Sequence, residues 1–307
     1  MTAPVVALVG ATASGKSTAA HRAALEVGNV EIVALDALTA YRGMDLGTAK
    51  PTTAERAELP YHLIDVLDAS EELSVRRYQF FGTEAMAGIA ARGHAALLVG
   101  GSGLYHRAIV DALRIPPHDD AVRHELVAAA SRPGGLAALY AELAALDALA
   151  ASRIEPRNER RVVRALEVIR ITALPFSSFG DGLNRYEDHG VDQIGIRFDP
   201  ERADAAIATR FHEWLGLGLL DELHGLLAAP GGLSRTARQA AGYRQLLEHL
   251  EGATPLDDAV DQAIAATRRL ARRQWRWFRR DPRIRWVDGP DEATSAIVKV
   301  LAARSSG

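Results

Sequence analysis

Residues 5–17 read VVALVGATASGKS, an apolar run that passes into a turn bounded by glycines. The run itself is typical of a buried strand, and residues 18–25 after the turn have the composition of a helix. The spacing within the turn fits the pattern G-x-x-x-x-G-K-[ST] of a phosphate-binding loop. The positions that carry this pattern are Gly10, Gly15, Lys16 and Ser17.

The residue types in this turn suit the binding of a diphosphate or a nucleotide. Gly10 and Gly15 let the backbone approach phosphate oxygens, and successive N–H groups at the start of the helix form an anion site. Lys16 supplies a cation, and the hydroxyl of Ser17 is a ligand for Mg²⁺. The alternative is an ordinary glycine-rich turn, but one of only three lysines in the chain stands here. We predict that the whole loop binds phosphate groups: Gly10, Ala11, Thr12, Ala13, Ser14, Gly15, Lys16 and Ser17.

The composition of the 307-residue chain is that of a globular protein, with 48% hydrophobic and 24% charged residues. A net charge of −3 does not by itself indicate a nucleic-acid partner. The absence of cysteine excludes disulfides, thiolate zinc sites and cysteine nucleophiles, and fits a cytoplasmic enzyme best. No apolar stretch approaches the length of a membrane span, so we expect no membrane partner.

Apolar runs alternate with helical patterns along the first hundred residues. The runs at 30–35, 61–65 and 95–99 each end at a polar or glycine-rich loop. This alternation predicts an α/β protein with a parallel sheet covered by helices on both faces, like that of the P-loop NTPases. Ligands of such sheets bind beyond the carboxyl ends of the strands, so we expect these loops to converge on one crevice.

The composition changes at residues 116–120, which read PPHDD. Residues 121–151 are rich in alanine and leucine and are interrupted at 133–135 by PGG, a pattern that predicts a pair of helices. We interpret this region as a helical lobe inserted into the core. The predicted division is a first part of the core at 1–115, a lobe at 116–157 and the rest of the core, with a basic helix, at 158–307.

Polar or glycine-rich residues follow two of the apolar runs. Asp36 stands at the carboxyl end of one run, where a carboxylate can act as a base or help to hold Mg²⁺ through water. The alternative is a capping or turn aspartate. The turn at 100–103, GGSG, is weaker evidence because tight packing often explains such turns. In the loop between them, Asp45 and Lys50 are either functional groups or solvated loop charges.

Arginines recur at helical spacing near the C-terminus and are interleaved with aromatic residues: Arg269, Arg272, Arg273, Trp275, Arg276, Trp277 and Arg280. Guanidinium groups suit phosphate, and aromatic rings suit unstacked bases. The alternative is a solvated helix paired with acidic neighbours, but few carboxylates lie nearby in the sequence. A second group of arginines lies at Arg160, Arg161 and Arg164. Two basic surfaces on a mildly acidic chain predict a polyanionic partner.

Taken in order along nearly the whole chain, these motifs resemble the bacterial tRNA dimethylallyltransferases, also called tRNA isopentenyltransferases. The segment YRGMDLGTAKP at 41–51, downstream of Asp36, matches the family, and its part from Gly43 to Pro51 is far more specific than the phosphate loop. Further matching segments are GGSGLY at 100–105, RRVVRALE at 160–167, GYR at 242–244 and TRR at 267–269. The family pattern has serine where this chain has Ala37, glutamine at Thr39 and threonine at Ser102.

The resemblance implies transfer of a dimethylallyl group from dimethylallyl diphosphate to the N6 amine of the adenosine on the 3′ side of a tRNA anticodon. It implies catalytic roles for Asp36, Thr12 and Lys16, and Mg²⁺ as a cofactor held at Ser17. We expect a monomer that binds the tRNA anticodon stem–loop. The implied tRNA-binding residues are Asp36, Ala37, Leu38, Thr39, Ser102, Arg123, Arg160, Arg161, Arg164, Gln239, Arg244, Arg272, Arg273 and Arg276.

Three other functions remain open at this point. A prenyltransferase that acts on free adenylate needs neither an inserted lobe nor an arginine-rich helix, so these features favour a tRNA acceptor. A small-molecule kinase also has a phosphate-binding loop and is distinguished by its use of ATP. A non-catalytic RNA-binding protein would bind tRNA and form no product.

Overall fold

A computed structural model of the chain describes residues 4–179, 183 and 185–305. Its contacts divide the chain into two units. We call Met1–Ala112 together with Tyr186–Gly307 the core, and Leu113–Arg185 the lobe.

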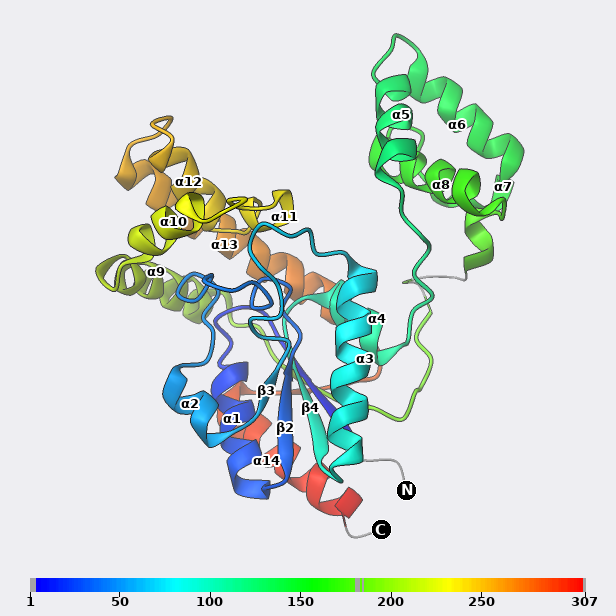
Figure 1. Cartoon of the computed structure of the whole chain (residues 1–307). Helices are drawn as coiled ribbons and strands as arrows, with labels where there is room; N and C mark the ends of the chain where they lie inside the picture. The colour runs from blue at the N-terminus through cyan, green and yellow to red at the C-terminus, as the bar shows by residue number, and fades with distance from the viewer. Residues whose placement is uncertain (1–3, 180–182, 184, 306–307) are drawn as a thin grey trace. The chain divides into compact units, whose positions relative to one another are not determined.

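The core is built on a six-stranded sheet with the strand order β3-β2-β4-β1-β5-β6, and all neighbouring strands are parallel (Figure 1). The strands are β1 Val5–Val9, β2 Val30–Ala34, β3 Tyr61–His62, β4 Ala95–Gly100, β5 Asp192–Ile196 and β6 Ile284–Val287. The central strand β1 pairs Val5–Val9 with Ala96–Gly100 on one side and Val6–Val9 with Asp192–Gly195 on the other. The predicted α/β class and parallel sheet are confirmed.

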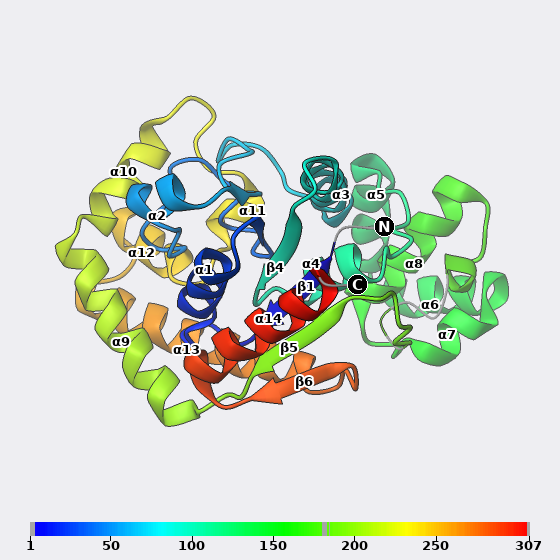
Figure 2. The same cartoon turned by 90° about the horizontal axis from the view of Figure 1, so that it is seen from below.

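Successive residues of a strand point to opposite faces, so the sheet separates two hydrophobic cores. Val6 and Leu8 face α1 (Lys16–Val27) and α14 (Gly289–Ser305), which lie side by side on one face (Figure 2). Ala7 faces the opposite core, to which α3 (Val75–Ala91) and α4 (Gly103–Val110) contribute. That core continues into the remaining helices: α9 (Pro200–Gly216), α10 (Leu219–Ala228), α11 (Arg235–Arg238), α12 (Tyr243–Leu250) and α13 (Leu256–Phe278). The short α2 (Thr53–Glu58) begins with a capping box at Thr52.

The lobe has its own hydrophobic core, formed by residues such as Leu126, Leu143 and Leu166. Its helices are α5 (Asp120–Ala130), α6 (Gly135–Leu146), α7 (Ala148–Arg153) and α8 (Glu159–Thr172), followed by the 3₁₀ turn η1 (Phe176–Phe179). Composition alone placed the end of this lobe at residue 157, whereas the contacts extend it to Arg185. The reason is that α8 packs its apolar face against α5 and α6.

None of the helices in the described ranges is both long and apolar enough to cross a membrane.

Candidate active site

The phosphate loop lies at the carboxyl end of β1 and is shaped by its glycines. Gly15 has φ +84°, a left-handed conformation that favours glycine. At Gly10, a Cβ atom would come within 2.8 Å of Oγ of Ser14. The helix α1 begins at the next residue, Lys16, and has no acidic residue in its first turn and no side-chain cap. Its N-terminal N–H groups are therefore left for an anion.

Two polar side chains of the loop lack the partners that such groups usually have. The Oγ atom of Ser14 is buried with no hydrogen-bond partner in the described part of the chain. The ammonium of Lys16 donates to the carbonyl of Ala11 at 3.2 Å. Burial lowers the pKa of Lys16 to about 8; Asp36 opposes this shift, and Arg210 adds to it. A polyanion would satisfy both groups.

Asp36 follows β2 and lies close enough to Lys16 for the charge of each to shift the pKa of the other. One of its carboxylate oxygens accepts a hydrogen bond from the N–H of Leu38 at 3.0 Å. Burial raises the pKa of Asp36, although the Leu38 N–H and the charge of Lys16 act in the opposite direction. The electrostatic coupling between the carboxylate and the ammonium shows that the predicted base and the predicted phosphate ligand lie close together.

The glycine turn after β4 is wedged between the other two loops. A Cβ on Gly100 would come within 2.2 Å of the carbonyl oxygen of Leu35, and one on Gly101 within 3.0 Å of the carbonyl oxygen of Gly10. Ser102 is half-buried at the start of α4. The loops after β1, β2 and β4 thus converge, which confirms the expectation for the runs at 30–35 and 95–99.

Ala37, Leu38 and Thr39 form the turn on which Asp36 stands. The Thr39 hydroxyl donates to the carbonyl of Asp36 at 2.9 Å, and only 7% of this residue is exposed. Ala37 is similarly buried, whereas Leu38 is half-buried. The Thr39 side chain therefore stabilises the turn.

The segment 41–51 is anchored by the buried side chains of Tyr41 and Met44, and its charged side chains are paired within the protein. The side chain of Lys50 is 1% exposed; its ammonium pairs with Asp45 at 2.7 Å and Asp65 at 2.5 Å and donates to the carbonyl of Tyr41 at 2.6 Å. Lys50 is therefore not a solvated loop charge. Lys50 instead links residues 41, 45 and 65 through its ammonium, and so fixes the conformation of the segment that follows Asp36.

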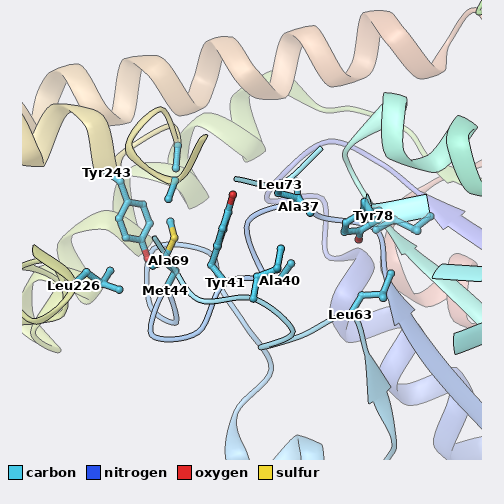
Figure 3. Close-up of a cluster of buried hydrophobic side chains, with 14 of the residues drawn as sticks. Ala37, Ala40, Tyr41, Met44, Leu63, Ala69, Leu73, Tyr78, Leu226 and Tyr243 are labelled. Atoms are coloured by element: carbon cyan, nitrogen blue, oxygen red, sulfur yellow. The ribbon is translucent and has the colours of Figure 1, made fainter. Parts of the chain in front are cut away.

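The same segment is held from outside by α10 and α12. One carboxylate oxygen of Glu222 accepts from the N–H groups of Asp45 and Leu46 at 2.9 and 2.8 Å, and the other accepts from the Tyr243 hydroxyl at 2.5 Å. Figure 3 shows Met44 beside Tyr243 in this part of the core. A Cβ at Gly47 would come within 2.3 Å of the Tyr243 ring, so glycine is required there.

Two residues at the site were missed by the sequence analysis. Gln274 of α13 is 8% exposed, and its side-chain oxygen accepts from the N–H of Thr12 at 2.8 Å. A lone amide on the apolar side of α13, beside Ala271, was a signal that could have indicated it. Arg210 of α9 lies close enough to Lys16 to influence its pKa, and no local pattern singled it out.

The lobe arginines divide into two groups. Glu167 is fully buried and pairs with Arg123 and Arg164, each at 2.9 Å. Arg123 and Arg164 therefore hold the lobe together. Arg160 and Arg161 are exposed at the start of α8.

The arginines of α13 divide in the same way. Arg272 pairs with Asp204 of α9 at 2.7 Å, a carboxylate distant in sequence, so the expectation that acidic neighbours are lacking was wrong for this residue. Arg273 and Arg276 are exposed and have no ion pair within the described ranges. A groove of about 540 Å³ runs along this face, lined by Phe198, Pro200, Arg269, Arg272, Arg273, Trp275 and Arg276.

Gln239 and Arg244 lie together on a second groove. Both are exposed, at the end of α11 and the start of α12. The groove has a volume of about 450 Å³ and is lined by Arg235, Arg238, Gln239, Arg244, Leu247, Glu248 and Glu251.

The family model of the IPP transferases matches residues 39–281. The chain belongs to the IPP transferase family. This IPP transferase is 42% identical over 303 residues to the tRNA dimethylallyltransferase of Nocardioides sp., covering 97% of each chain. It is 44% identical over 306 residues to that of Kocuria rhizophila, covering 98% of this chain and 96% of the relative.

Solved structures of the IPP transferase family have the same fold. The tRNA isopentenylpyrophosphate transferase of Bacillus halodurans matches with a TM-score of 0.69 at 34% identity, over 99% of this chain and 98% of that one. A eukaryotic dimethylallyltransferase acting on tRNA matches with a TM-score of 0.76 at 22% identity, over 99% of this chain and 77% of that one. The chain is accordingly a prenyltransferase.

Proposed function

We propose that this IPP transferase transfers a dimethylallyl group from dimethylallyl diphosphate to the N6 amine of the adenosine on the 3′ side of a tRNA anticodon. The observation that carries the proposal is the convergence of the loops after β1 and β2, which brings Lys16 and Asp36 close enough for each charge to shift the pKa of the other. A phosphate site and a base then lie within reach of one reaction centre. The acceptor follows from relatives that are named tRNA dimethylallyltransferases.

The phosphate loop stabilises the leaving group. As the allylic carbon–oxygen bond breaks, negative charge accumulates on the diphosphate. The N–H groups at the start of α1, the ammonium of Lys16 and the buried hydroxyl of Ser14 are placed to receive that charge. Arg210 adds a second cation near Lys16. Gln274 holds the loop in shape through Thr12.

Asp36 receives the proton of the acceptor. The carbon–nitrogen bond forms as the carbon–oxygen bond breaks, and one N6 proton passes to the carboxylate. A neutral exocyclic amine is a weak acid, so this proton transfer comes late, and a raised carboxyl pKa makes Asp36 a stronger base. The adenine must leave its stack to reach the pocket, at a cost of a few kcal/mol.

Mg²⁺ fits this site through oxygen ligands. No group of three or more histidine, cysteine, aspartate or glutamate side chains in the described residues is arranged to hold a metal ion. The exposed hydroxyl of Ser17, at the start of α1, would be a protein ligand, with substrate oxygens and water supplying the others. When bound, the ion would neutralise charge on the diphosphate.

We also propose that the protein acts as a monomer in the cytoplasm and binds the anticodon stem–loop. The binding of the stem–loop is supported by the exposed arginines of the lobe and of α13: Arg160, Arg161, Arg273 and Arg276. Ser102, Gln239 and Arg244 complete the set of half-buried or exposed contacts. The turn residues Ala37, Leu38 and Thr39 would act by placing Asp36.

Labelled dimethylallyl diphosphate offered to tRNA or to AMP tests the proposal. We expect the label in tRNA alone, on the adenosine beside the anticodon, without any requirement for ATP. Label on AMP alone would show a free-adenylate prenyltransferase, and ATP-dependent phosphorylation of an acceptor would show a kinase. Binding of tRNA without any product would show an RNA-binding protein.

Replacing both Arg273 and Arg276 by glutamine should weaken tRNA binding and flatten its salt dependence. Each lost phosphate contact lowers the slope of log Kd against log salt concentration by about 1, so we expect a change of about 1 to 2. The measurement is tRNA affinity at several salt concentrations. Arg272→Gln is the matched control, because Arg272 is already paired with Asp204 and should change the slope less. An unchanged slope in the double variant would show that this face is only solvated.

A further inference from the structure

Four charged side chains form a buried cluster between the end of α4 and the start of β6. The side chains of Arg107, Asp111 and Asp281 are 3% to 4% exposed, and that of Arg283 is 13% exposed. Arg107 pairs with Asp111, and Arg283 pairs with Asp111 at 2.7 Å and with Asp281 at 2.6 Å. The removal of four charges from water costs more than a simple apolar contact would, so stability alone is a poor explanation for the cluster.

The cluster holds both places where the chain crosses between the core and the lobe. Asp111 stands next to Ala112, where the core ends, and Tyr186 is the residue at which the chain returns. Arg283 donates to the carbonyl of Glu187 and to the carboxylate of Asp111. The ring of Tyr186 lies 4.4 Å from the guanidinium carbon of Arg107 and 5.5 Å from that of Arg283. The segment that leaves the core and the segment that returns to it thus contact the same two guanidinium groups, those of Arg107 and Arg283.

The cluster is also joined to the active site by two rigid elements. Its residue Asp111 caps the end of α4, whose other end begins beside Ser102 in the glycine turn. Its residue Asp281 lies just beyond α13, which carries Gln274 against the phosphate loop. Between them, the buried ring of His106 packs edge-on against Phe278 at 5.5 Å. Both chain crossings are therefore connected to α4 and α13, the helices that border the candidate active site.

We propose that Arg283 and Asp111 are positioning residues for the RNA substrate, which they serve by tying both chain crossings to α4 and α13, the helices that border the phosphate loop and the glycine turn. The proposal rests on the proposed function, since the lobe is taken to bind the tRNA whose adenine reaches Asp36. Neither residue has a role in binding the donor or in the chemical step. Their loss should therefore affect tRNA and leave dimethylallyl diphosphate untouched.

The test is the steady-state kinetics of Arg283→Met, a variant of similar length without charge or donors. We expect the KM for tRNA to rise about tenfold, within the range of couplings between sites, while kcat and the KM for dimethylallyl diphosphate stay within about twofold of wild type. Arg283→Lys keeps the charge and one donor group, so it should recover part of the loss. It is also the variant to use if Arg283→Met does not fold.

Glu31→Gln is the matched control for a loss of buried charge. Glu31 is 2% exposed and pairs with Arg92 at 2.7 Å, His62 at 2.6 Å and His94 at 2.8 Å. It lies near the amino end of β2, so its replacement should lower the unfolding temperature without changing the KM for tRNA.

Two outcomes separate this proposal from the proposed function. If Arg283→Met and Arg283→Lys lower the unfolding temperature but leave the KM for tRNA unchanged, as Glu31→Gln should, the cluster only stabilises the core and the inference is overturned. If wild type itself places no label in tRNA, the proposed function fails first, whatever the variants do.

Discussion

Asp36→Asn should lose prenyl transfer by about 10² to 10⁴-fold in kcat while tRNA binding stays nearly intact. The amide keeps an oxygen that can accept from the Leu38 N–H, so the turn should survive. It has no carboxylate to take the proton that leaves the N6 amine. Single-turnover assays with labelled donor measure the first effect, and tRNA binding measures the second.

The control for this variant is Asp45→Asn, which changes a neighbouring loop carboxylate that is 57% exposed and paired with Lys50. We expect kcat within a few-fold of wild type, because Lys50 keeps its partner Asp65. An Asp36→Asn enzyme with a near-normal rate would remove Asp36 from the chemistry.

The pH profile gives an independent check on Asp36. Burial raises the pKa of its carboxyl, and a protonated carboxyl cannot accept a proton. The value of kcat/KM should therefore fall as the pH drops through that pKa, at a pH above the usual range for aspartate. This acidic limb should be absent from the residual activity of Asp36→Asn.

Lys16→Met should raise the KM for dimethylallyl diphosphate and lower kcat, with a combined loss of about 10² to 10³-fold in kcat/KM. The variant removes the charge that opposes the developing negative charge of the leaving group and leaves Ser14 and the loop N–H groups in place. Steady-state kinetics with the donor varied at saturating tRNA measure both parameters.

The same lysine predicts a basic limb for donor binding. Burial lowers the pKa of Lys16 to about 8, so in the free enzyme the ammonium loses its proton as the pH rises past this value. The affinity for the diphosphate should therefore decrease above about pH 8, and Lys16→Met should not show that decrease. Lys299→Met is the matched control, since Lys299 is an exposed lysine of α14 and its loss should change neither parameter. Donor kinetics of Lys16→Met equal to those of Lys299→Met would contradict the assignment.

Local sequence patterns were sufficient to predict the parallel sheet and the glycine-bounded loop after its first strand. The run Val5–Val9 is buried as β1 because it is apolar throughout, and the left-handed conformation at Gly15 requires glycine where the pattern has it. Asp36 and the turn at 100–103 were found because parallel strands all deliver their carboxyl ends to one edge of the sheet. These features depend on neighbours along the chain, which a sequence displays directly.

The partners of these residues come from distant segments and were decided by packing. Thr12 and Gln274 are 262 positions apart, and Asp204 neutralises Arg272 from another helix. The helix α8 joins the lobe because its apolar face fits α5 and α6, although its arginines suggested a free basic surface. Contacts between side chains of different helices leave no periodic signal in the sequence. The hydrophobic periodicity of a helix shows which of its faces is buried, and it does not show which helix covers that face. Composition therefore located the charges, and folding determined which of them remain available for RNA.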